Sequence, residues 1–181
     1  KINECLLVAN DNEHSFIYLY LPNVANSYDI QRIKSVLTEI GQENIGIVAN
    51  NLYALCFTKL GFKTLIGYQM NVTNLMTAQV LFDRGAEAFI KSIESDLNSE
   101  LPIGHNYVGK PTLMTFCHCP YKTVYDYDSC KDCDFHDGLY YQAEDNNSYY
   151  IRRTQCSSCY FELVFNEKIG EESGCDVIDL R

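Results

Sequence analysis

The sequence predicts an α/β fold: a partial (β/α) barrel of the TIM type followed by a small cysteine-rich β subdomain. Two observations predict it. Over the first hundred residues, short apolar runs typical of strands alternate with segments whose apolar residues recur at helical spacing. After Pro111 this alternation stops, and six of the nine cysteines fall between Cys117 and Cys159. We therefore predict two domains, residues 1–110 and 111–181.

The apolar runs of the first domain predict four strands, each followed by a helix. The strands are expected at residues 16–23, 45–51, 63–72 and 86–92, and the helices at 27–41, 52–61, 74–85 and 94–101. Helix caps are expected at Asn74 and at either Ser27 or Asp29, with glycines ending the first three helices. Short connections between such segments favour parallel βα units, and four units make half of an eight-stranded barrel.

Polar residues follow the predicted strands where a parallel α/β fold forms its active face. Gln69 and Asn71 interrupt an otherwise apolar predicted strand, and Lys91 stands at the end of the next one. We predict that these three residues bind substrate. Other polar residues near strand ends are equally explained as loop and cap residues, namely Asn50, Asn51 and Asn74.

The second domain reads as a strand, an irregular segment and a hairpin. Residues 111–116 predict a strand, and residues 138–145 and 148–155 flank a turn signal rich in Asp and Asn. Residues 159–166 predict a further strand. The irregular segment at residues 118–137, between the first strand and the hairpin, is rich in Tyr, Asp and Cys.

Charge and hydropathy exclude several classes of function. The net charge of −10 argues against a broad electrostatic grip on nucleic acid, which needs Lys and Arg to neutralise phosphates. No apolar run approaches the roughly 20 residues that span a bilayer, and no signal peptide is visible, so we expect a cytoplasmic protein. The chain lacks a starting Met, which suggests a domain of a longer parent chain. Its remaining half would complete the barrel, and open sheet edges favour a homo-oligomer.

The cysteine pattern predicts a metal centre. An odd number of cysteines without a secretory signal argues against a disulfide framework, whereas a CxxC pair is typical of metal sites. The predicted ligands are Cys119, Cys130, Cys133 and Cys159. Thiolates of this kind select zinc or an iron–sulfur cluster. Lone Cys56 is interpreted as a small buried hydrophobe.

Several neighbours compete for places in this ligand set. Cys117 and Cys156 each lie close to a predicted ligand. If the strand at 111–116 continues, Cys117 and Cys119 point to the same side and His118 to the other. His136 offers an alternative nitrogen ligand for a Cys₃His zinc site.

The stretches GKPTLMTFCHCPYK, CKDC, the hairpin ending in IRR, and CYFEL resemble the C-terminal portion of the collagenase-like peptidase family, peptidase family U32. IGIVANNLYAL followed by GYQMNVTNL is similar to that family's barrel strands. The resemblance implies a barrel with a Cys₄ centre ligated by the four predicted cysteines. It implies a 4Fe–4S cluster, with zinc as the alternative.

The same resemblance implies an enzyme that takes part in hydroxylating RNA bases or a quinone ring, with substrate at the strand ends. Peptidase activity, which the family name implies, is an alternative. The chain has no HExxH motif, no GxSxG motif and no evident Cys–His pair outside the cysteine cluster, which counts against a peptidase. A third alternative is a closed structural zinc site that does no chemistry.

Overall fold

The structure, a computed structural model, describes residues 17–94, 104–125, 139–142, 147–170 and 177–178. The chain divides into two compact units. The first comprises Lys1–Asn23 and Ile30–His105, and the second comprises Val24–Asp29 and Asn106–Arg181. Within the described part of the chain, no helix has the length and apolar character needed to cross a membrane.

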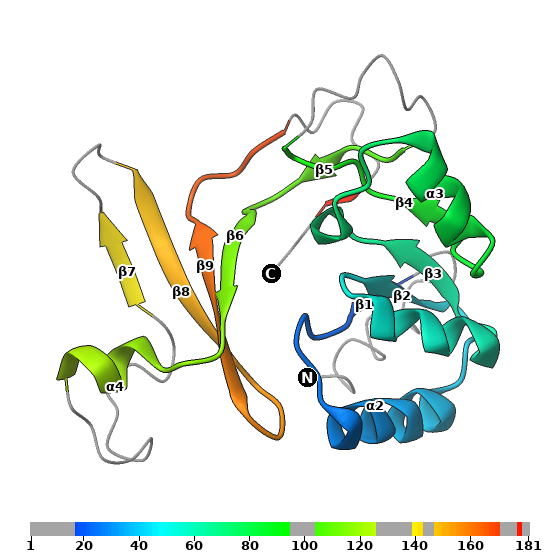
Figure 1. Cartoon of the computed structure of the whole chain (residues 1–181), viewed down its shortest axis with the longest axis horizontal. Coiled ribbons are helices and arrows are strands. Elements are labelled where there is room, and N and C mark those ends of the chain that lie inside the picture. Colours follow the sequence, from blue (N-terminus) through cyan, green and yellow to red (C-terminus); the bar gives the residue numbers. More distant parts are fainter. Residues whose placement is uncertain (1–16, 95–103, 126–138, 143–146, 171–176, 179–181) are drawn as a thin grey trace. The chain divides into compact units, whose positions relative to one another are not determined.

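The first unit contains a four-stranded parallel sheet in the order β1-β2-β3-β4, so the predicted mixed α/β fold with parallel strands is confirmed (Figure 1). The strands are β1 (Ile17–Tyr20), β2 (Ile45–Ala49), β3 (Lys63–Ile66) and β4 (Ala88–Phe89). They are connected by α2 (Ser27–Ile40), the 3₁₀ helix η1 (Leu52–Leu60), the short 3₁₀ turn η2 (Tyr68–Met70) and α3 (Leu75–Phe82).

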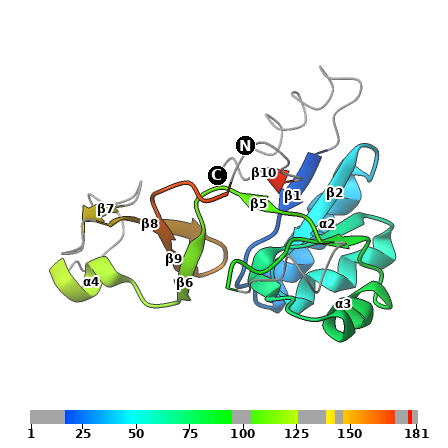
Figure 2. The same ribbon diagram turned by 90° about the horizontal axis from the view of Figure 1, so that it is seen from above.

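The core of this unit lies between the sheet and its helices. Successive side chains of a strand point to opposite faces, so Ile45, Ile47 and Ala49 of β2 share one face. They belong to one buried cluster with Leu37 of α2 and Phe57 of η1. The helices therefore cover a single face of the sheet (Figures 1 and 2). Burial of each Ile, Leu or Phe side chain contributes roughly 1.5–3 kcal/mol to the free energy of unfolding.

Two helix starts show how local sequence sets the element bounds. The Asn26 Oδ1 atom accepts a hydrogen bond from the Asp29 backbone N–H at 3.0 Å, and Asp29 Oδ2 accepts one from the Asn26 N–H at 3.2 Å. This reciprocal capping box makes Asn26 the cap of α2, so the predicted caps Ser27 and Asp29 were too late by one and three residues. The predicted cap of α3 is confirmed, because Asn74 Oδ1 accepts from the Thr77 N–H at 2.8 Å.

The helix predicted at residues 52–61 is a 3₁₀ helix, and this changes the place of Cys56. With three residues per turn, Ala54 and Phe57 share the buried face, whereas Cys56 lies on the exposed side. The prediction that Cys56 is buried was therefore wrong. Partial burial still raises the pKa of its thiol above the ordinary value, an effect that the charge of Lys34 opposes.

The strand predicted at residues 63–72 ends at Ile66. Residues beyond Gly67 form η2, and Asn71 then adopts the left-handed conformation with φ 51°, which asparagine tolerates better than most residues. The strand predicted at 86–92 likewise shortens to β4, followed by an isolated parallel bridge between Ile90 and His105. Most of the helix predicted at 94–101 falls outside the described residues.

The second unit contains a four-stranded antiparallel sheet in the order β6-β9-β8-β7 and a two-stranded parallel ladder of β5 with β10. The elements are β5 (Tyr107–Val108), β6 (Thr112–Phe116), α4 (Pro120–Tyr125), β7 (Leu139–Gln142), β8 (Ser148–Gln155), β9 (Cys159–Phe165) and β10 (Val177–Ile178). The predicted pairing of β7 with β8 is confirmed, and residues 143–146 of its turn lie outside the described residues.

Helix α4 was not predicted. It packs on the sheet through Tyr121, whose ring meets Phe161 edge-on with centroids 6.0 Å apart. Phe116 stacks on the same Phe161 ring at 5.8 Å. A six-residue helix with one buried side chain shows no helical periodicity in its sequence, so the apolar pattern gave no sign of it.

Candidate functional site

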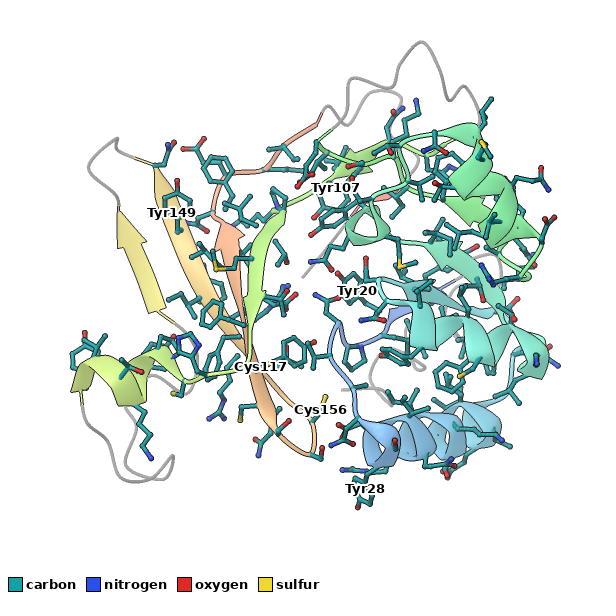
Figure 3. The ribbon with its side chains drawn as sticks, in the orientation of Figure 1. Tyr20, Tyr28, Tyr107, Cys117, Tyr149 and Cys156 are labelled. Carbon is teal, nitrogen blue, oxygen red and sulfur yellow. The ribbon has the colours of Figure 1, made fainter. Side chains whose placement is uncertain are left out.

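Strand pairing brings two cysteine pairs to one edge of the antiparallel sheet. The pairing of β6 with β9 ends at Phe116 with Phe161, and the pairing of β8 with β9 ends at Gln155 with Cys159. The end of β6 and the turn between β8 and β9 therefore share an edge. Figure 3 shows Cys117 and Cys156 there. We call this the cysteine edge, and it consists of Cys117, Cys119, Cys156 and Cys159.

Cys117, Cys119 and Cys159 of the cysteine edge carry free thiols. Cys117 is exposed, whereas Cys119, Cys156 and Cys159 are partly buried. Because β6 ends at Phe116, neither Cys117 nor Cys119 lies on a strand, and the expected alternation between them does not hold. His118 instead packs its ring against Phe116, with centroids 5.4 Å apart.

The other predicted ligands lie outside the described residues. Cys130, Cys133 and the alternative ligand His136 belong to residues 126–138, which join α4 to β7. Within the described part of the chain, no three His, Cys, Asp or Glu side chains come together as a metal site. The four-cysteine centre stays a prediction.

A second candidate site lies at the carboxyl edge of the parallel sheet. A cavity of about 580 Å³ opens where β2 and β3 end and α3 begins, and Asn50, Gln69, Met70, Met76 and Arg84 line it. Parallel α/β sheets bind ligands at this edge. Met76, at the rim of this cavity, is 82 % exposed.

The sequence interpretation missed the importance of Asn50 in this cavity. Asn50 is only 7 % exposed, and neither its Oδ1 nor its Nδ2 atom has a hydrogen-bond partner. A buried polar group without a partner costs about 1–3 kcal/mol, so such groups are rare. The position of Asn50 directly after a fully buried strand was the available signal, but asparagine is also common in loops.

Of the three predicted substrate residues, Gln69 alone belongs to the described lining of the cavity. Its Oε1 atom accepts a hydrogen bond from the Tyr20 hydroxyl at 2.8 Å, which orients the amide (Figure 3 labels Tyr20). Gln69 and Asn71 do not interrupt a strand as predicted, because both follow the end of β3.

Asn71 and Lys91 occupy the neighbouring strand end. The Asn71 amide is engaged, since Oδ1 accepts from the Ser92 hydroxyl and Nδ2 donates to Glu94 Oε2 at 3.3 Å. The Lys91 backbone N–H donates to the His105 carbonyl at 2.9 Å. These bonds tie residues 91–94 to the end of β3, so Asn71 has a structural role in the fold.

Comparison of the chain with protein families, with curated proteins and with solved structures gave no match.

Proposed function

We propose that this chain is part of a peptidase U32 family protein that carries a Cys₄ metal centre and a partial barrel of the TIM type. The proposed ligands are Cys119, Cys130, Cys133 and Cys159. The proposed activity is an iron–sulfur-dependent hydroxylation of RNA bases or of a quinone ring. The residue patterns around these cysteines and along the parallel strands motivate the proposal.

One observation supports the metal centre above the others. Cys119 and Cys159 are 40 positions apart in the sequence, yet strand pairing brings their chain segments to one edge of one sheet. Residues 126–138, which carry Cys130 and Cys133, begin and end in the same unit. The two described ligands, Cys119 and Cys159, therefore come from a single compact unit, as one metal centre requires.

The chemistry of the donors fits the proposed group. Cys119 and Cys159 are partly buried free thiols, and thiolates are the ligands that iron–sulfur clusters and zinc prefer. A bound 4Fe–4S cluster would supply one-electron transfer. The chain itself would hold the cluster and limit its contact with solvent.

The cavity at the carboxyl edge favours a quinone ring over RNA as the substrate. Its lining combines apolar side chains such as Met70 and Met76 with the amide of Gln69, which can donate a hydrogen bond to a ring carbonyl. Arg84 is the one cationic side chain in the described lining, and the chain carries a net charge of −10. RNA binding depends on more positive charge than this.

Anaerobic purification with iron, sulfide and zinc analysis tests the metal centre. We expect about four iron atoms per chain and absorbance near ~400 nm, as for a 4Fe–4S protein. One zinc per chain and no visible absorbance would support the structural zinc alternative. A protein that contains neither metal would contradict the proposal.

Single cysteine variants test the ligand set. Cys133→Ser should lower the metal content, because it removes a proposed ligand, whereas Cys156→Ser should leave it unchanged. Cys56→Ser is the matched control, since Cys56 lies on η1 of the first unit. If Cys156→Ser loses metal, the ligand is Cys156 and not Cys159.

A further inference from the structure

A buried carboxylate holds the turn of the cysteine edge. Asp29 is 5 % exposed, and its Oδ1 atom accepts a hydrogen bond from the Ser157 backbone N–H at 2.7 Å. Its Oδ2 atom accepts one from the Ser157 hydroxyl at 2.8 Å. Asn26 Nδ2 donates to the same hydroxyl oxygen at 2.5 Å. Residues 24–29 and Ser157 belong to the same compact unit, although 128 positions separate Asp29 from Ser157.

Ser157 stands in the turn that presents two cysteines. The turn consists of residues 156–158 between the paired residues Gln155 and Cys159, and the Cys156 N–H donates to the Ser158 carbonyl at 3.0 Å. A hydrogen bond to Ser157 therefore restrains the turn one residue after Cys156 and two residues before Cys159. Bonds to a carboxylate are about twice as strong as bonds between neutral groups.

Asp29 is placed to orient this turn and not to bind a metal itself. Both of its oxygens already accept hydrogen bonds, and Oδ2 accepts a second one from the Asn26 N–H in the capping box of α2. The carboxylate also lies in the first turn of α2, where the helix dipole favours a negative charge. Asp29 is therefore held both by the Ser157 turn and by the capping box of α2.

We infer that Asp29 is a positioning residue for the proposed metal centre, because it holds the Ser157 turn and with it the backbone that leads into the proposed ligand Cys159. The inference rests on the proposed Cys₄ centre. Groups that orient metal ligands without touching the metal typically change metal affinity by 10- to 100-fold when they are removed. Asp29 would act in this way through the backbone of the Ser157 turn, which leads into Cys159.

The experiment compares metal loss from variants of the full chain purified anaerobically. The readout is the rate at which bound iron or zinc passes to an added chelator, with circular dichroism to confirm that each variant is folded. Ser157→Val and Ser157→Thr have nearly the same shape, but only threonine keeps the hydroxyl. We expect Ser157→Val and Asp29→Asn to lose metal about tenfold to a hundredfold faster than the unchanged chain.

Two controls give the test its specificity. Ser157→Thr should lose metal at the rate of the unchanged chain, because it retains the donor to Asp29. Ser158→Ala changes the exposed neighbour in the same turn, whose carbonyl and not its hydroxyl makes the turn bond, and should also leave the rate unchanged.

The outcomes separate the inference from the proposed function. If the unchanged chain binds metal and both Ser157→Val and Asp29→Asn retain it equally well, the positioning role of Asp29 is wrong and the metal centre stands. A lower melting temperature of the metal-free chain with an unchanged rate of metal loss also overturns the positioning role. If the unchanged chain binds no metal, the proposed function fails, and the inference fails with it. If Asp29→Asn does not fold, the comparison of Ser157→Val with Ser157→Thr decides whether the positioning role holds.

Discussion

At the scale of single residues, Asn50 and Gly67 depend on one another. Gly67 has an ordinary φ of −76°, so its backbone does not require glycine. What requires glycine is the Asn50 amide, because a Cβ atom at Gly67 would lie 1.9 Å from Asn50 Oδ1 and 2.6 Å from Cγ. The ends of β2 and β3 thus approach each other around a buried amide that has no partner.

We predict that Gly67→Ala destabilises the chain by about 1–3 kcal/mol, as overpacking of a closed site usually does. Asn50→Ala should cost less than a typical core truncation, because it also removes two unsatisfied polar atoms. The double variant should recover most of the loss caused by Gly67→Ala. Urea unfolding of the four proteins measures this coupling, and simple additivity of the two effects would contradict the contact.

At the scale of elements, a buried ion pair connects three strands of the antiparallel sheet. Glu162 of β9 is 2 % exposed, and its Oε2 atom lies 3.0 Å from Nε of Arg152, its direct cross-strand partner on β8. Its Oε1 atom accepts from the Thr112 hydroxyl of β6 at 3.3 Å. The pair sets the register of the strands that carry the cysteine edge.

Arg152→Met should destabilise the sheet by about 3–5 kcal/mol, because it leaves the Glu162 carboxylate buried without its cation. The double variant Arg152→Met with Glu162→Leu should regain much of this stability, since a buried pair is often replaceable by apolar residues. Arg153→Met is the matched control on the opposite face of β8. Thermal unfolding compares them, and equal losses for Arg152→Met and Arg153→Met would contradict the role of the pair.

At the scale of the whole molecule, the chain has two units with different sources of stability. The first unit buries a continuous apolar cluster between its sheet and helices. Among its described residues, the second unit has fewer buried apolar side chains: Tyr107, Val108, Tyr121, Tyr160, Phe161 and Val164. A loop-rich region with a small core gains folding free energy from a bound metal.

Removal of the metal by a chelator should therefore loosen the second unit selectively. We expect faster amide hydrogen exchange in β6, β8 and β9 and little change in β2 and β3, because only the second unit carries the proposed ligands. Hydrogen exchange followed by mass spectrometry resolves these segments. Equal loosening of both units, or of neither, would count against a metal that stabilises the second unit.

The sequence alone determined the features that depend on local pattern. Apolar spacing located the first three strands and the helices between them, and the strands of the antiparallel sheet, because side-chain periodicity reports which face is buried. Asn74 was recognisable as a cap because capping is a contact over three residues. The same local reasoning overextended β3 past Ile66 and overlooked α4, whose one buried side chain leaves no periodic trace.

Tertiary structure decided what distant segments do together. The order β6-β9-β8-β7 brings the segments of Cys119 and Cys159 to one edge, and no spacing in the sequence specifies which strands become neighbours. The bond between Asp29 and Ser157 joins residues 128 positions apart, and the isolation of the Asn50 amide depends on everything packed around it. Burial and non-local pairing are properties of the folded chain, so they become visible only when the chain is folded.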